Sequence, residues 1–322
     1  MCSVQPGQQL DHYFIESVIA HSGTSTIFRG TDLRTGRQVA IKVPHMEAES
    51  DLAFFERFRR EGEIGQKLEH PGIAKVLRDD DRSRIYIVKE WAEGKPLRTL
   101  LNELHKLPVD RAVRITLRIC DVLEYIHSHG VVHRDLKPEN VIIDTDDNIK
   151  LIDFGIAGNA GSRRLTFGKF SNTMGTPDYI SPEQVNGKRG DARSDLFALG
   201  VMLYEMLTGR APFEGPNPLA IMNDRLLNDP VPPRKIDWTI SPQLQRVIYH
   251  AMERNPDKRY ATAKDLAYDL EHQDEVSVIE NSELHEAKRR HSSWQQDIFS
   301  YAPLGLIPIL IFTLLFYVAR HP

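Results

Sequence analysis

The feature that most constrains this chain is the segment 133–140, which reads His-Arg-Asp-Leu-Lys-Pro-Glu-Asn and is followed by Asp153 in an Asp-Phe-Gly sequence. Asn140 and Asp153 lie 153 − 140 = 13 positions apart. Phosphoryl transfer needs a carboxylate that orients the attacking hydroxyl, and oxygen ligands for the metal that neutralises phosphate charge. Asp135 is the candidate for the first role. Asn140 and Asp153 are the candidates for the second, because amide and carboxylate oxygens suit Mg²⁺.

A lysine upstream of this segment is the next candidate for phosphate chemistry. The sequence Val-Ala-Ile-Lys at 39–42 places Lys42 on a predicted strand, where its charge could hold the α- and β-phosphates of a nucleotide. Such a lysine needs a carboxylate that fixes its rotamer. Glu61 lies 61 − 42 = 19 positions later on a predicted helix and is the candidate, although Glu56 or Glu63 would serve equally well without the spacing.

Hydrophobic periodicity predicts a small strand-rich part before a larger helical part, which is an α+β organisation. Apolar and polar residues alternate within 13–43, a pattern typical of strands, and another strand is expected at 84–88. Helical spacing and short apolar runs give the remaining expectations: helices over 47–68 and 110–129, short strands flanking 133–153, and further helices within 182–273.

Composition excludes several classes of protein. The 322 residues include 41 Lys and Arg against 45 Asp and Glu, and a formal net charge of −4 gives no sign of a nucleic-acid partner. The hydrophobic fraction of 41% is that of a globular protein rather than of a disordered chain or a fibre. The two cysteines, Cys2 and Cys120, cannot form a disulfide framework, so the bulk of the chain is expected in the cytosol.

Taken together, these motifs resemble the Hanks-type, eukaryotic-like Ser/Thr protein kinases, and especially their bacterial branch, over residues 13–271. The resemblance implies a bilobal protein-kinase fold, with a β-rich N-lobe over about 13–90 and a helical C-lobe over about 91–271, and ATP bound between them. The motif residues occur in the family's order: Lys42, Glu61, Asp135, Asn140, Asp153, Ser181-Pro182-Glu183, Asp195 and Arg259.

The resemblance also assigns roles to individual residues. It implies catalytic roles for Asp135, Lys137 and Lys42, with Lys137 near the γ-phosphate, and it implies that Asp195 anchors the catalytic loop. It further implies structural roles for Arg134, which precedes the catalytic aspartate, and for a pair of Glu183 with Arg259. The residues that it places in the ATP-binding site are Lys42, Glu61, Ile19, Ser22, Gly23, Ile27, Ala40, Glu90, Ala92 and Ile142.

One loop and one further residue depart from the family pattern. The phosphate-covering loop at 20–27 reads Ala-His-Ser-Gly-Thr-Ser-Thr-Ile, so that Ala20, Ser22 and Ser25 stand where glycines would let backbone N–H groups approach phosphates. We expect a weaker affinity for ATP with the chemistry retained. Lys89 lies at the position behind adenine that is usually uncharged. It needs water or a carboxylate such as Glu61 or Asp153, unless the register is shifted by one residue or its stem reaches the surface.

The segment 155–176 carries the candidate regulatory sites. In kinases with an arginine at the position of Arg134, phosphate in this segment often orders the loop through arginine pairs. The candidate phosphosites are Thr166, Ser171 and Thr173. A polar loop without a regulatory role is the alternative.

The C-terminal end changes composition abruptly. Residues 272–301 are polar and form an expected juxtamembrane linker, whereas 302–319 carry no charge and are long enough for a single transmembrane helix. The cations at 288–290 lie on the kinase side, which by the positive-inside rule predicts a cell-membrane protein with a cytoplasmic kinase domain. A helix buried against the kinase domain is the alternative. Residues 1–12 are expected to form an N-terminal tail.

The expected function is ATP-dependent phosphorylation of Ser or Thr on proteins, with autophosphorylation in the activation loop. The implied cofactors are ATP and Mg²⁺, with Mn²⁺ as an alternative metal. The expected partners are a protein substrate and membrane lipid around the C-terminal helix, and a homodimer stays open. Two other classes also stay open: a membrane-anchored pseudokinase or scaffold, and a small-molecule phosphotransferase of similar fold.

Overall fold

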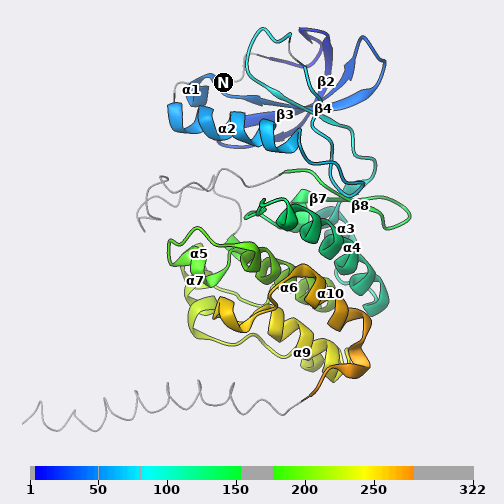
Figure 1. Cartoon of the computed structure of the whole chain (residues 1–322), viewed down its shortest axis with the longest axis vertical. Coiled ribbons are helices and arrows are strands. Elements are labelled where there is room, and N and C mark those ends of the chain that lie inside the picture. Colours follow the sequence, from blue (N-terminus) through cyan, green and yellow to red (C-terminus); the bar gives the residue numbers. More distant parts are fainter. Residues whose placement is uncertain (1–3, 50, 80, 154–176, 279–322) are drawn as a thin grey trace, which may run out of the picture. The chain divides into compact units, whose positions relative to one another are not determined.

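An antiparallel sheet with the strand order β1-β2-β3-β4-β5 forms the N-terminal lobe (Figure 1). The computed structural model describes residues 4–49, 51–79, 81–153 and 177–278. Apolar side chains on one face, among them Ile15, Phe28 and Ile41, are buried together as the core of this lobe. The strands are β1 (Gln9–Leu10), β2 (Tyr13–His21), β3 (Ser25–Asp32), β4 (Gln38–Pro44) and β5 (Ile87–Glu90).

Two strands of this sheet differ from the sequence prediction. The strand expected at 84–88 lies at Ile87–Glu90, because its pairing with β4 runs from Lys42–Ile87 to Val39–Glu90. Strand β1 lies within the expected N-terminal tail, where Leu10 is buried and pairs with Tyr13.

The helix expected over 47–68 is divided into α1 (Met46–Glu49) and α2 (Leu52–Gly65). Asp51 caps the N-terminus of α2, because its side chain accepts hydrogen bonds from the amides of Ala53 at 2.9 Å and Phe54 at 3.3 Å. Phe58 packs with Val76 and Ile87 of the sheet region, which fixes the face of α2 that carries Glu61.

Helices α4 (Val109–Ser128) and α6 (Ala192–Thr208) lie at the centre of the C-terminal lobe. Ile115, Ile119, Val122 and Ile126 are fully buried, as their helical spacing predicts. Every side chain of α6 from Ser194 to Thr208 is buried. The other α-helices are α3 (Leu97–Leu104), α5 (Pro182–Val185), α7 (Pro218–Leu227), α8 (Pro233–Ile236), α9 (Pro242–Ala251) and α10 (Ala263–Glu271).

A second, three-stranded sheet positions the segments that carry the chemistry. Its strands are β6 (Lys95–Pro96), β7 (Val141–Ile143) and β8 (Ile149–Leu151). The 3-10 turn η1 (Pro138–Asn140) leads directly into β7, and Asp153 follows β8 by two residues. The antiparallel pairing of Val141 with Leu151 therefore brings the two ends that carry Asn140 and Asp153 to the same edge. Further 3-10 turns are η2 (Pro177–Tyr179), η3 (Pro256–Lys258) and η4 (Gln273–Glu275).

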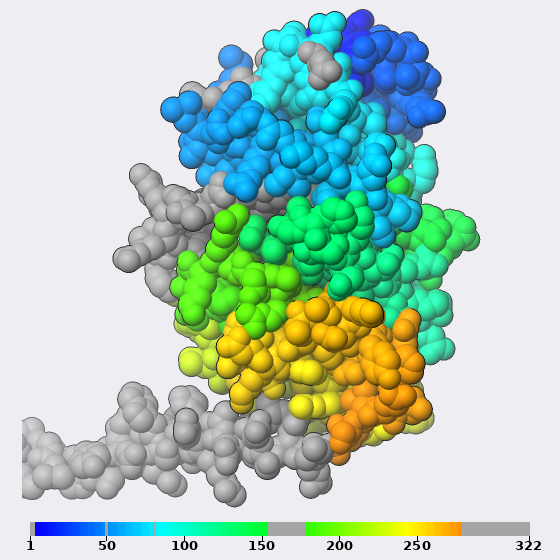
Figure 2. All heavy atoms as spheres, in the orientation of Figure 1, coloured from blue at the N-terminus to red at the C-terminus, as the bar shows by residue number. Residues whose placement is uncertain are grey.

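The bilobal arrangement expected from the sequence is confirmed: a β-sheet lobe precedes a helical lobe, which the blue-to-cyan and green-to-orange atoms of Figure 2 distinguish. Within the four described ranges, no helix combines the length and apolar character that crossing a membrane requires. The expected transmembrane segment 302–319 lies outside the described residues.

Candidate active site

Lys42 of β4 and Glu61 of α2 form an ion pair at one side of a pocket. The Lys42 Nζ atom donates to Glu61 Oε1 at 3.0 Å and to Oε2 at 3.1 Å, and it lies 3.9 Å from Asp153 Oδ1. Burial alone would lower the pKa of Lys42, but the charges of Asp153 and then Glu61 outweigh burial and raise this pKa above its ordinary value. Lys42 is therefore a permanent cation in the pocket.

The catalytic loop places Asp135 beside a second lysine. Lys137 Nζ donates to Asp135 Oδ2 at 2.7 Å. The Asn140 amide nitrogen donates to the main-chain oxygen of Asp135 at 2.7 Å and to its Oδ2 at 3.1 Å. These bonds fix the orientation of the Asn140 side chain and leave its Oδ1 atom as an acceptor.

Asp195, at the start of α6, holds this loop from inside the lobe. Its carboxylate accepts hydrogen bonds from the amides of His133 at 2.8 Å and Arg134 at 2.7 Å, and it lies 2.8 Å from His127 Nε2. Arg134 has a positive φ of 63°, a conformation that a non-glycine residue adopts only when its surroundings impose it. Asp195 therefore fixes the backbone directly before Asp135.

Complete burial lowers the pKa of His133, so that its imidazole is neutral at neutral pH. Its Nδ1 atom accepts a hydrogen bond from the amide of Asp135 at 3.3 Å. His127, a further partner of Asp195, was not predicted from the sequence. Its place in the last turn of the amphipathic helix α4 gave no specific signal for that contact.

The turn between β2 and β3 covers the pocket and is closed by serine hydroxyls. Ser22 Oγ accepts a hydrogen bond from the amide of Ser25 at 3.0 Å and lies 3.0 Å from its Oγ, while the amide of Ser22 donates to the carbonyl of Ser25 at 2.8 Å. At least one backbone N–H of this loop is thus engaged by a side chain instead of pointing freely into the pocket.

The pocket has a volume of about 260 Å³. Its lining includes four predicted nucleotide-site residues, Lys42, Glu61, Ser22 and Ile27, together with Asp135, Lys137, Asn140 and Asp153. The described residues Ile19, Gly23, Ala40, Glu90, Ala92 and Ile142, also expected in the nucleotide site, lie outside this lining. The structure therefore brings the expected phosphate-binding and catalytic side chains together, while six of the ten residues expected in the ATP-binding site lie outside this lining.

Helix α2 supplies three lining residues that the sequence analysis missed, namely Phe54, Arg57 and Phe58. A signal for them was available, because they precede Glu61 by seven, four and three positions and so share its helix face. Glu56 and Glu63 are instead salt-bridge partners of the exposed Arg59. The spacing that selected Glu61 over these two glutamates therefore agrees with the observed pairing.

Lys89 of β5 points into the same group of charges. It is 6% exposed, and its Nζ atom donates to Asp153 Oδ1 and to the carbonyl of Ile152, and lies 3.4 Å from Glu61 Oε1. Both carboxylates that the sequence suggested as partners are thus in contact with it. Although burial opposes ionisation of Asp153, the charges of Lys42 and then Lys89 hold its pKa well below the usual range.

The oxygen atoms that the pocket offers suit a divalent ion that takes its remaining ligands from a bound phosphate compound and from water. Among the described residues, no group of three or more His, Cys, Asp and Glu side chains could hold a metal ion. Asn140 and Asp153 nevertheless both line the pocket, which fits Mg²⁺, because Mg²⁺ usually takes one or two protein oxygens and completes its shell with phosphates and water.

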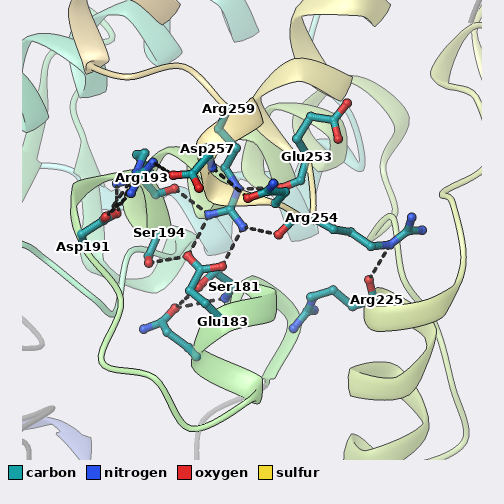
Figure 3. A network of polar contacts seen from close by, with 12 residues as sticks. Ser181, Glu183, Asp191, Arg193, Ser194, Arg225, Glu253, Arg254, Asp257 and Arg259 are labelled. Atoms are coloured by element: carbon teal, nitrogen blue, oxygen red, sulfur yellow. Dashed lines mark hydrogen bonds and ion pairs between the residues drawn. The ribbon is translucent and has the colours of Figure 1, made fainter. Parts of the chain in front are cut away.

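Glu183 of α5 and Arg259 form a buried ion pair in the C-terminal lobe (Figure 3). Arg259 Nη1 donates to Glu183 Oε1 at 2.8 Å and Nη2 to Oε2 at 2.6 Å, and Ser194 Oγ also donates to Oε1 at 2.6 Å. These hydrogen bonds and the charge of Arg259 outweigh burial and lower the pKa of Glu183. The pairing that the resemblance implied is therefore present.

The candidate phosphosites Thr166, Ser171 and Thr173 lie outside the described residues. The same holds for Phe154 and Gly155 of the Asp-Phe-Gly sequence.

Comparison with known proteins defines the class. Residues 13–270 match the protein kinase domain family, and the chain belongs to this family. It is 37% identical over 272 residues to a probable serine/threonine-protein kinase of Streptomyces coelicolor, covering 83% of this chain and 40% of the relative. It is 36% identical over 270 residues to the serine/threonine-protein kinase PknB of Mycolicibacterium smegmatis, covering 82% and 43% respectively. The chain thus spans about two fifths of the length of these relatives.

The fold is also that of a solved kinase domain. The crystal structure of the Mycobacterium tuberculosis PknI kinase domain matches with a TM-score of 0.66 at 22% identity, over 84% of this chain and 100% of that one. The expected resemblance to bacterial Hanks-type kinases is confirmed by these comparisons, and family membership implies use of ATP and a divalent metal.

Proposed function

We propose that this chain is a Ser/Thr protein kinase that transfers the γ-phosphate of Mg-ATP to serine or threonine hydroxyls of proteins. The observation that carries this proposal is the convergence of Lys42, Asp135, Asn140 and Asp153 on one pocket. Family membership and relatives named as serine/threonine-protein kinases support the same activity.

In the proposed reaction, Lys42 holds the α- and β-phosphates while Glu61 keeps the lysine extended into the pocket. Asp135 orients the acceptor hydroxyl and takes up its proton as the new O–P bond forms, while the bond between the γ-phosphorus and the β,γ-bridging oxygen breaks and ADP leaves. Lys137 Nζ, 2.7 Å from Asp135 Oδ2, supplies positive charge where the γ-phosphoryl group is transferred. A metal ion bound by Asn140 and Asp153 would neutralise charge on the phosphate oxygens.

The test of this proposal is an Asp135→Asn variant of the full chain. We expect its affinity for a fluorescent ATP analogue to stay within about threefold, while phosphate transfer from radiolabelled ATP falls by about a hundredfold or more, the range typical of lost acid–base catalysis. Asp146→Asn, at an exposed position in the turn before β8, is the matched control and should transfer phosphate normally. Normal turnover in Asp135→Asn would refute the role of Asp135.

A catalytically weak pseudokinase or scaffold is the second candidate. Two observations favour it: Lys89 contacts the carboxylate of Asp153, and Ser22 engages an amide of the phosphate-covering loop. The same assay with radiolabelled ATP separates the candidates, because a pseudokinase would bind nucleotide without incorporating label into itself or into a general protein substrate.

We further propose that residues 302–319 anchor the chain in the cell membrane as a single span, with the kinase domain in the cytoplasm. The support comes from the sequence, in which this uncharged stretch follows the cations at 288–290. The chain should then stay with the membrane pellet after an alkaline wash, and a version that ends at residue 301 should be released. Phosphate on Thr166, Ser171 or Thr173 is a separate proposal, to be tested by mass spectrometry after incubation with Mg-ATP.

A further inference from the structure

Lys89 is a buried cation in direct contact with a carboxylate that the proposed reaction needs for metal binding. Strand pairing places it with little freedom, since Lys89 lies opposite Ala40 of β4 on one side and forms a bridge with Val76 on the other. Its side chain is 7% exposed, so its ammonium group cannot be satisfied mainly by water. Its acceptors are Asp153 Oδ1, the carbonyl of Ile152 and, at 3.4 Å, Glu61 Oε1.

Four charged side chains therefore contact one another in the pocket. They are Lys42, Lys89, Glu61 and Asp153. Lys42 lies 3.0 Å from Glu61 and 3.9 Å from Asp153, and Lys89 contacts the same two carboxylates. The formal charge of this group is zero. Without Lys89 the group would carry one negative charge, centred on the carboxylate proposed to receive the metal.

We propose that Lys89 competes with the divalent metal ion for the carboxylate of Asp153 and thereby weakens the dependence of nucleotide binding on metal. The proposal rests on the proposed function, because Asp153 is a metal ligand only in that reaction. A cation that already neutralises a carboxylate lowers its attraction for a second cation and repels that cation directly. For the metal ion to bind Asp153 fully, the Nζ atom of Lys89 must move away from Asp153 Oδ1. It can move towards the Ile152 carbonyl and Glu61, both of which it already contacts.

The competition is measured as a ratio of nucleotide affinities, because metal and nucleotide binding are thermodynamically coupled. A fluorescent ATP analogue is titrated into the full chain, once with EDTA and once with saturating Mn²⁺. Lys89→Met, which keeps an unbranched side chain of similar length without charge, should increase the Mn²⁺-dependent gain in affinity by at least about tenfold over the unaltered chain. This readout involves no phosphate transfer, and the ratio cancels any effect of Lys89 on nucleotide affinity itself.

Three matched variants locate the effect. Lys89→Arg keeps the positive charge and should leave the ratio within about threefold of its original value. Lys75→Met removes an exposed lysine that pairs with the exposed Glu69 at 3.0 Å, and it should not change the ratio. Adding Asp153→Asn to Lys89→Met should abolish the increase that Lys89→Met alone produces, because the carboxylate for which Lys89 and the metal compete is then absent.

The outcomes separate this inference from the proposed function. Equal ratios for the unaltered chain and for Lys89→Met, with both proteins folded by circular dichroism and both binding the analogue, would overturn the competition. A gain that persists with Asp153→Asn would overturn it as well. Absence of any binding of the analogue to the folded, unaltered chain would instead overturn the proposed function, and the inference with it.

Discussion

Replacement of Arg259 by methionine should lower the free energy of unfolding more than the removal of an exposed ion pair would. The guanidinium has five N–H donors, and each has an acceptor. Two go to Glu183, and the other three go to the carbonyls of Arg193 at 3.0 Å, Glu253 at 2.6 Å and Arg254 at 3.1 Å. Its side chain is fully buried, with the Cζ atom 4.9 Å from the centre of the Phe197 ring.

The magnitude follows from what Arg259→Met leaves behind. Glu183, whose side chain is 8% exposed, would keep a buried charge with only the Ser194 hydroxyl as a short side-chain donor. Loss of one partner of a buried ion pair costs about 3–5 kcal/mol of unfolding free energy. For a domain of this size, each kcal/mol corresponds to about 2–4 °C of melting temperature. The melting temperature should therefore fall by about 6–20 °C.

The assay is urea unfolding of the full chain followed by circular dichroism, with the slope of the transition checked for constancy. Arg59→Met is the control: it removes an exposed arginine that pairs with Glu56 and Glu63, and it should leave the free energy of unfolding almost unchanged. Glu183→Leu combined with Arg259→Met should regain part of the loss, because no buried charge then remains. A loss in Arg259→Met no larger than that of Arg59→Met would refute the reasoning.

Three further predictions concern the loop, a turn and pH. Ser22→Gly frees the amide of Ser25 that the serine hydroxyl now engages, and it should improve affinity for an ATP analogue by about fivefold, equivalent to one hydrogen bond, in a fluorescence titration; no gain would contradict the account of the loop. Gly94→Ala should lower the unfolding free energy by about 2–4 kcal/mol, because φ is 115° and the added Cβ would lie 2.1 Å from the carbonyl oxygen of Ile143; an unchanged urea midpoint would contradict this. Because the pKa of Glu183 is lowered from 4.5, its contribution to stability is present above about pH 4.5 and is lost as pH falls through the folded value, so Glu183→Gln should flatten the acid limb of a plot of urea midpoint against pH.

The residues that we propose as catalytic and phosphate-binding could be predicted because they follow fixed spacings along the chain. Lys42 and Glu61 lie on a strand and a helix whose faces follow from periodicity, and the segment 133–140 is short enough to be read as a unit. Asn140 and Asp153 lie close together because the antiparallel strands β7 and β8 lie between them in the chain and pair with each other.

The sequence offered Glu61 and Asp153 as partners of Lys89, but it could not choose between these carboxylates, water and a shifted register. Lys89 lies 28 positions from Glu61 and 64 positions from Asp153, and its contacts depend on how β5 packs against α2 and the end of β8. The role of Ser22 was also hidden, because the same residue is compatible with an open loop and with a turn closed on Ser25. These features depend on tertiary packing and on the choice of a side-chain rotamer, which periodicity does not encode.

The anchoring of the catalytic loop by Asp195 bears on how chains of this kind diversify. The carboxylate that fixes the amides of His133 and Arg134 belongs to α6, the helix enclosed on all sides. The position of Asp135 is therefore fixed by the hydrophobic interior of the lobe and not by the surface around the pocket. Substitutions at the rim of the pocket should therefore leave the position of Asp135, the carboxylate that we propose orients the acceptor hydroxyl, unchanged.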